Sequence, residues 1–174
     1  MAWFKKVGNT KLLKAEGEGE AEWGEEAFKK AMKSEGRIPE LESIIAGNYS
    51  LSYQYAFNKL HGRFLEGEEA ILLSSCMAIQ YAMNVIKGRW PEAEGQILED
   101  AGYAVSYAEN VIGGRWPEAE DIILTDPAAA MQYAVEVIGG RWLEGESVIR
   151  SYPATSEIYS SFLDNQAYED EKEG

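Results

Sequence analysis

The chain has very few of the residues on which most catalytic and metal sites depend. Its 174 residues include one cysteine, Cys76, and one histidine, His61. A single cysteine excludes an internal disulfide and is typical of a reducing compartment, so we expect a cytoplasmic protein. No His, Cys or acidic residues fall at metal-ligand spacing, and no glycine loop suits a phosphate. We therefore expect no metal and no cofactor.

Long apolar runs are also missing, and basic residues are few. No stretch is long and apolar enough to serve as a signal peptide or to span a membrane. Lys and Arg number 16 against 30 Asp and Glu, for a net charge of −14. Residues 1–50 hold nine acids against eight Lys and Arg, so most of the excess lies beyond them. An acidic surface repels nucleic acid and favours basic protein partners. A homo-oligomer also remains possible.

A heptapeptide pattern recurs with a fixed period. The sequence GRWPEAE occupies residues 88–94 and returns, unchanged, 26 residues later at 114–120. Altered copies occupy 140–146, 62–68 and 36–42. A period in this range indicates a repeat architecture, in which each unit buries its apolar face against its neighbours.

The residues around each copy predict two short helices. In residues 74–99, apolar side chains recur at helical spacing up to Lys87, and we expect Gly88 to end that helix in the left-handed conformation. Pro91 then suits the first position of a second helix, and acids follow in its first turn. Asp126 followed by Pro127 predicts the start of another helix, with an N-cap acid and a first-turn proline. Helices of roughly 11 and 8 residues are unstable alone, so stacking must stabilise them.

These observations predict an all-α fold, a short right-handed α-solenoid of helical hairpins with a 26-residue period. We expect a loosely ordered N-terminal arm at 1–21, the helical repeat domain at 22–165 and a disordered acidic tail at 166–174. The residues that recur at fixed positions are expected to be structural: Tyr55, Tyr81, Tyr107, Tyr133, Gly88, Gly114, Arg89, Arg115, Arg141, Trp90, Trp116 and Trp142.

The pattern Y-A-x-x-V-I-x-G-R-W-P-E-A-E resembles a helical repeat of bacteriophage and bacterial proteins of unassigned function. The resemblance covers 36–151 closely and 23–165 loosely, with Leu65 and Leu143 replacing the proline. It implies an α-solenoid and a phage origin, which would place the protein in the host cytoplasm. It transfers no catalytic residues.

Several residues could carry chemistry, but a structural role explains each of them better. His61 precedes Gly62 at a helix end, where a polar or positive group suits the helix dipole. We expect Cys76 to be a small, buried residue that fills space in the core. We expect the acid pairs, such as Glu92 and Glu94, to match the helix dipole and to pair with the neighbouring arginines. The aromatic series is expected to pack between units rather than to stack on bases.

A polar stripe lies opposite the apolar face of the longer helices. Helical spacing of i and i+4 places its members on one side of each helix: Gln54, Asn58, Gln80, Asn84, Asn110, Gln132 and Glu136. Each helix is expected to present a trio at i, i+4 and i+7. Ser106 begins the third trio, and the last positions of the four trios are His61, Lys87, Gly113 and Gly139. Two interpretations stay open. The amides form a protein-binding strip, or they bridge adjacent helices and stabilise the stack.

The sequence therefore favours a non-enzymatic binding protein that engages another protein, such as a phage-encoded inhibitor or adaptor acting on a host system, including a defence system. The first alternative is an acidic nucleic-acid mimic that occupies a basic cleft. The second alternative is an enzyme, which would need a convergent pocket of unlike residues. Direct nucleic-acid binding and membrane binding are not expected.

Overall fold

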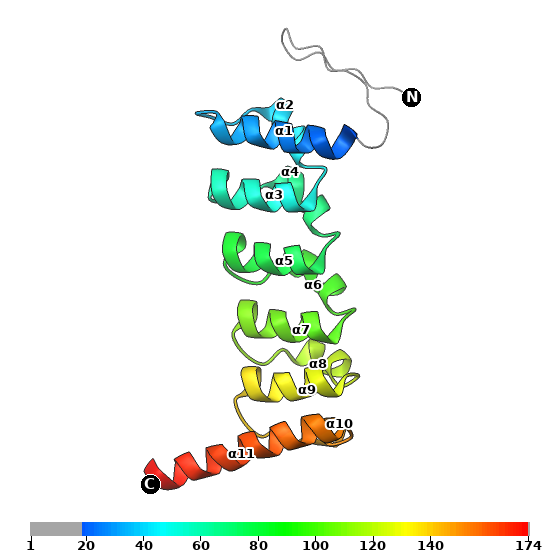
Figure 1. The fold of residues 1–174 in the computed structure, drawn as a ribbon, viewed down its shortest axis with the longest axis vertical. Coiled ribbons are helices and arrows are strands. Elements are labelled where there is room, and N and C mark those ends of the chain that lie inside the picture. Colours follow the sequence, from blue (N-terminus) through cyan, green and yellow to red (C-terminus); the bar gives the residue numbers. More distant parts are fainter. Residues whose placement is uncertain (1–18, 174) are drawn as a thin grey trace. The chain divides into compact units, whose positions relative to one another are not determined.

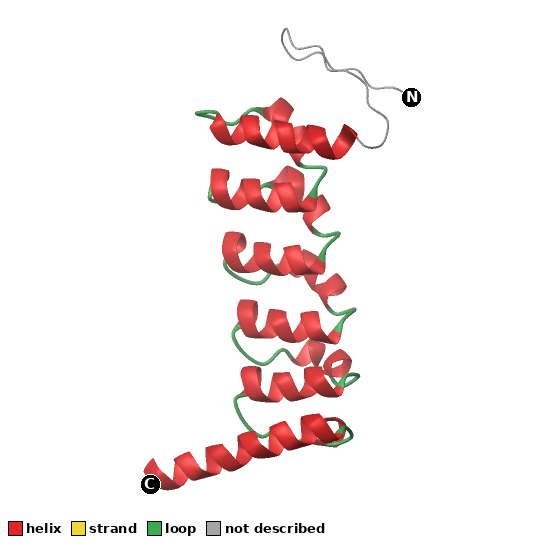
Figure 2. Ribbon diagram, viewed as in Figure 1, coloured by secondary structure: helices red, strands yellow, loops and turns green. Residues whose placement is uncertain are grey.

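The computed structural model describes residues 19–173, and these residues form helices joined by short loops, with no strand among them (Figure 2). The described chain is therefore all-α, as the sequence predicts. The arm expected at 1–21 lies outside the described residues up to residue 18, and the first helix begins inside it, at Gly19. No described helix is both long and apolar enough to cross a membrane.

The described helices belong to two compact units that divide between Met77 and Ala78. Unit 1 contains α1 (Gly19–Lys33), α2 (Pro39–Ile45), α3 (Tyr49–Tyr55), the π-helical turn η1 (Ala56–Leu60) and α4 (Leu65–Ile71). The division falls within α5 (Ser75–Tyr81). Unit 2 continues with η2 (Ala82–Ile86), α6 (Pro91–Ile97), α7 (Ala101–Tyr107), η3 (Ala108–Ile112), α8 (Pro117–Ile123), α9 (Pro127–Gln132), η4 (Tyr133–Ile138), α10 (Glu146–Ile149) and α11 (Pro153–Glu173).

Local sequence explains where these helices begin. Proline occupies the first turn of α2, α6, α8 and α9, where its missing N–H would be unpaired in any case. Asn48, Asp100 and Asp126 cap α3, α7 and α9, and their side-chain oxygens accept hydrogen bonds from backbone N–H groups of the first turn. The Asp126–Pro127 pair therefore begins a helix, as expected.

In four hairpins the longer helix (α3, α5, α7 or α9) does not end as a plain α-helix. It widens into a π-helical turn, η1 to η4, and the next residue then adopts the left-handed conformation. That residue is His61, Lys87, Gly113 or Gly139. The expectation that Gly88 would be left-handed is therefore wrong by one residue. A π turn contains one residue more than an α-helical turn. A prediction that counts 3.6 residues per turn does not include this residue, so it misplaces the end of the helix.

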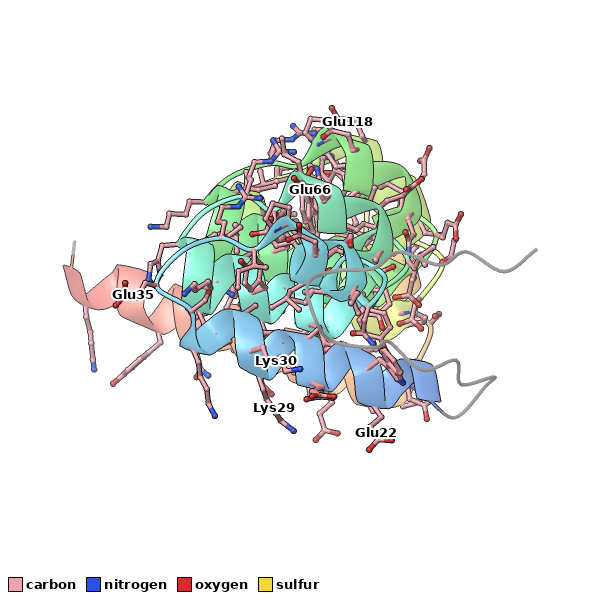
Figure 3. The ribbon with its side chains drawn as sticks, turned by 90° about the horizontal axis from the view of Figure 1, so that it is seen from above. Glu22, Lys29, Lys30, Glu35, Glu66 and Glu118 are labelled. Atoms are coloured by element: carbon pink, nitrogen blue, oxygen red, sulfur yellow. The ribbon has the colours of Figure 1, made fainter. Side chains whose placement is uncertain are left out.

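Unit 1 packs α1 against α2 and α3, and α3 against α4 (Figure 1). Tyr55, Ile45, Phe64 and Ile71 are fully buried in it. Gly67 allows α4 to approach α3 closely, because a Cβ at this position would lie 2.5 Å from the Ser52 hydroxyl oxygen. The outer side of α1 is charged, and Figure 3 shows Lys29, Lys30 and Glu22 directed away from the helices.

Unit 2 repeats one packing arrangement. The longer helices α7, α9 and α11 lie side by side, and the short helices α8 and α10 pack against them (Figure 1). The core side chains of this unit are fully buried and recur at 26-residue spacing: Trp90, Trp116 and Trp142; Ile97, Ile123 and Ile149; Tyr81, Tyr107, Tyr133 and Tyr159. The expectation that the tryptophans pack internally agrees with this burial.

The tail expected to be disordered at 166–174 lies within α11 as far as Glu173. Gln166 donates a hydrogen bond of 2.6 Å to the carbonyl oxygen of Gly139, which anchors this part of the helix to the end of η4. One turn further on, the Lys172 ammonium lies 4.2 Å from the centre of the Tyr168 ring. These contacts, which composition alone does not reveal, stabilise helix in an acidic segment.

Candidate partner-binding surface

A hydrogen-bonded network, which we call the latch, connects each hairpin of unit 2 to the following one. The backbone N–H of Trp116 donates to the hydroxyl of Tyr133 at 2.6 Å, and that hydroxyl donates to Glu120 at 3.1 Å. The Glu120 carboxylate in turn accepts two hydrogen bonds from Arg115, at 2.8 and 3.0 Å. Because Trp116 is the N-cap of α8, the tyrosine of the next hairpin satisfies a backbone donor at a helix start.

The same latch recurs one period earlier. Trp90 donates its N–H to Tyr107 at 2.6 Å, Tyr107 donates to Glu94 at 3.1 Å, and Arg89 forks onto Glu94 with two bonds of 2.8 Å. One period later, Trp142 donates to Tyr159 at 2.8 Å. Each tryptophan ring also lies 5.1 Å from the tyrosine ring of its own hairpin. The residues of the aromatic pairs and of the latch recur at fixed positions of the repeat, and their contacts give them a structural role.

Unit 1 contains a variant of the latch. Arg37 forks onto Glu42 at 2.8 and 2.9 Å, and Tyr55 donates to the same carboxylate at 2.7 Å. Isoleucine replaces tryptophan at position 38. A further ion pair of 3.5 Å joins Arg37 to Glu66 on α4. This unit therefore keeps the Arg–Glu–Tyr contacts even where the heptapeptide is least similar to the others.

The latch shifts the ionisation of its members in consistent directions. The hydrogen bonds from Arg115 hold the pKa of Glu120 below its usual range, and those from Arg89 do the same for the pKa of Glu94. Burial raises the pKa of Tyr107 to about 12. The carboxylates stay ionised and the phenols stay protonated around neutral pH, which is the protonation state that the latch requires.

The first acid of each pair lies outside the latch. Glu92, Glu118 and Glu144 are exposed in the first turns of the short helices or just before them. The expected pairing with the arginines is therefore made by Glu94, Glu120 and Glu146.

One type of polar group in the described core has no hydrogen-bond partner. The indole N–H groups of Trp90, Trp116 and Trp142 are buried and make no hydrogen bond with the described residues. Phe64, which has no such group, occupies the same repeat position and is equally buried.

The left-handed residues lead to a testable consequence for stability. Lys87 has φ 61°, where a side chain is strained, whereas Gly113 occupies the equivalent position without a Cβ. We expect Lys87→Gly to raise the free energy of unfolding by about 0.5 to 1 kcal/mol, after the greater entropy of glycine in the unfolded chain is subtracted.

The reciprocal substitution Gly113→Lys is the matched control. No atom lies within 4 Å of a Cβ built on Gly113, so only backbone strain is introduced. It should lower stability by a similar amount in urea denaturation. A destabilised Lys87→Gly protein would contradict the assignment of the left-handed residue.

The structure places the residues of the predicted polar strip on the longer helices with different exposures. Asn58, Asn110, Gln132 and Glu136 are exposed, and Gln54, Gln80 and Asn84 are half-buried. Three hydrogen bonds of these residues lie within single helices: Gln54 donates to Ser50, Asn84 donates to Gln80, and Asn110 donates to the Ser106 carbonyl oxygen. These bonds occupy part of the amide capacity and leave other donors and acceptors of the exposed members facing solvent.

The last position of each predicted trio does not share the helix face. His61, Lys87, Gly113 and Gly139 follow the π turn in the left-handed conformation, so a count of i+7 does not describe them. His61 Nδ1 lies 3.1 Å from the Phe57 carbonyl oxygen, a contact to its own helix.

Cys76 is exposed, so the interpretation as a buried filler is wrong. Among the described residues, no group of three His, Cys or acidic side chains is arranged to hold a metal.

The latch is the feature that sequence reasoning missed. Its signal was present, because each tyrosine follows the tryptophan by 17 residues and the glutamate by 13.

Comparisons with protein-family models, with curated proteins and with solved structures gave no match.

Proposed function

We propose that the chain is a non-enzymatic α-solenoid of 26-residue repeats that binds another protein. The observation that carries the proposal is the latch. In each full repeat of unit 2 the arginine and the second glutamate of the heptapeptide, together with the following tyrosine, form internal contacts. These repeated ionisable groups therefore stabilise the stacking of hairpins. The outer face of the longer helices takes no part in the latch, so its residues can differ from one hairpin to the next.

The polar strip is the surface that we assign to the partner. In unit 2 it combines exposed amides with one carboxylate, at Asn110, Gln132 and Glu136. Extended faces of helical repeats commonly bind partners, and amides supply donors and acceptors that give orientation without a high desolvation cost. The hydrogen bonds from Gln54 to Ser50 and from Asn110 to the Ser106 carbonyl oxygen lie within single helices, which supports this role.

The identity of the partner rests on the resemblance to phage helical repeats. We propose a phage-encoded inhibitor or adaptor that engages a host protein in the host cytoplasm, with host defence systems among the candidates. The net charge of −14 supports a protein target over nucleic acid.

Affinity capture with a strip variant tests this function. The wild-type chain should capture one host protein from lysate of the host cell, identified by mass spectrometry. Replacing Asn110 and Gln132 together by alanine should weaken its binding at least about tenfold, a loss typical of central interface residues.

The control replaces Asp121 and Ser147, which are exposed on the short-helix side of the same unit, by alanine. It should bind as the wild type does. Unchanged binding by the strip variant, at unchanged thermal stability, would remove the strip from the proposal.

A nucleic-acid mimic is the second candidate, and the charge of unit 2 favours it. Residues 78–174 hold 18 acids against six Lys and Arg, and three of those arginines are committed to the latch. A mimic would occupy a basic cleft, and its affinity would fall steeply between about 50 and 200 mM salt. Weak salt dependence would favour the strip.

A further inference from the structure

The polar strip of unit 2 continues onto an apolar side chain. One position of the strip is Ser106 on α7 and Gln132 on α9, and its equivalent on α11 is Ile158. Ile158 is 53% exposed. The register of the repeat holds here, because the adjacent Tyr159 is fully buried and accepts a hydrogen bond from Trp142. The fold does not require isoleucine at this position, because glutamine or serine occupies it in the other hairpins.

The helices next to Ile158 carry exposed carboxylates and no basic side chain. The segments α7, η3, α9 and η4 contain no Lys or Arg. The carboxylates are Glu109 on η3, Glu136 on η4 and Glu157 on α11, and all three are exposed. None of them forms an ion pair with a described residue. This face is therefore complementary in charge to a basic partner.

The amides of this face have free hydrogen-bonding groups. Gln132 forms no hydrogen bond with a described residue, and Asn110 uses one N–H for the Ser106 carbonyl oxygen. A side-chain amide can donate to a peptide carbonyl and accept from a peptide N–H. Both groups are free in an extended chain, whereas a helix bonds them internally. The amides therefore suit an extended segment better than a helix.

The spacing of the longer helices also suits an extended segment. The helices α7, α9 and α11 lie side by side (Figure 1). Packed helices are about 8 to 10 Å apart. An extended chain advances about 9 to 10 Å over about three residues, in the polyproline II or the strand conformation. A segment laid across these helices therefore meets the next helix with about every third residue.

We propose that unit 2 binds an extended, basic peptide segment that crosses α7, α9 and α11. A large apolar residue of the segment packs on Ile158, and Asn110 and Gln132 bond to its backbone. Lys or Arg residues about three and six positions from the apolar residue pair with Glu136 and Glu109. This inference rests on the proposed function, because it gives the partner of the strip a chemical class.

Selection from a display library of random peptides of about 12 residues, long enough to cross three helices, tests the inference with the full chain as bait. The selected peptides should combine a large apolar residue with Lys or Arg about three or six positions away. Ile158→Gln should weaken their binding at least about tenfold, a loss typical of a buried apolar anchor. Gln132 occupies the equivalent position, so the fold accepts this substitution.

Glu136→Asn tests the charge of the same surface, and Asn110 occupies its equivalent position. It should weaken binding of the selected peptides about three- to fivefold at low salt, and by less in about 500 mM NaCl. Leu143→Gln and Glu118→Asn are the matched controls. They make the same chemical changes at exposed positions on the short-helix side and should bind within about twofold of the wild type.

Peptides without the basic and apolar pattern would overturn the inference, and so would equal losses in Ile158→Gln and Leu143→Gln. The absence of any selected peptide would also overturn it. If a host protein is still captured through Asn110 and Gln132 in that case, the proposed function stands and the partner presents a folded surface. If the chain captures no host protein and selects no peptide, the proposed function fails as well.

Discussion

Replacing Tyr133 by phenylalanine should lower the free energy of unfolding by about 2 to 3 kcal/mol, although only one oxygen atom is lost. The Tyr133 hydroxyl accepts from the buried backbone N–H of Trp116 and donates to Glu120. Removing it leaves that N–H without its partner at the start of α8. An unpaired buried donor costs far more than an average hydrogen bond contributes. Urea denaturation followed by circular dichroism measures the change.

Tyr103→Phe provides the control for this experiment. Tyr103 lies on α7, is 41% exposed and takes no part in the latch. Its substitution should change stability by less than about 0.5 kcal/mol, as is usual for exposed positions. If the two variants lost equal amounts, the latch would not contribute to the stability of unit 2.

The second large effect concerns Glu120 and depends on pH. At pH 7 we expect Glu120→Gln to lower the free energy of unfolding by about 2 kcal/mol, because it weakens the charge-assisted hydrogen bonds from Arg115. Solvent partly screens these bonds, which limits the size of the effect. The pKa of Glu120 in the folded protein lies below its ordinary value of 4.5, chiefly because of these bonds. The stability that the carboxylate contributes is therefore fully present above 4.5 and is lost as the pH falls through the lower, folded-state pKa.

The difference between wild type and Glu120→Gln should consequently shrink towards zero as the pH falls, because a protonated glutamate resembles glutamine. Thermal or urea unfolding of both proteins from neutral to strongly acidic pH measures this difference. The comparison also removes the effect of the other acids, which titrate equally in both proteins. A difference that stays constant with pH would show that Glu120 acts through its shape rather than its charge.

Much of the helical organisation could be predicted from local rules. Proline at positions 91 and 117 and the cap at Asp126 begin helices as expected, because first-turn geometry depends on neighbouring residues. The Arg–Glu pairing within each heptapeptide is local for the same reason. The burial of Trp90 and Trp116 followed from their recurrence at one position of the repeat.

The remaining features depend on contacts between residues far apart in sequence. The bond from Trp116 to Tyr133 joins two hairpins, so no pattern within one helix predicts it. With the π turn, the left-handed residue is Lys87 and not Gly88. The third position of each predicted trio therefore lies just after the helix and not on its face. The hydrogen bond from Gln166 in α11 to the Gly139 carbonyl oxygen joins residues 27 apart, and composition does not predict it.

In unit 2, the hydroxyl groups of Tyr107, Tyr133 and Tyr159 accept hydrogen bonds from backbone N–H groups at or just before the start of the preceding short helix. Hydrogen exchange of the Trp90, Trp116 and Trp142 amides, measured by NMR on the full-length protein, tests this claim directly. We predict exchange as slow as that of core amides, because each N–H is buried and bonded to a tyrosine hydroxyl. Exchange as fast as that of exposed loop amides would contradict it.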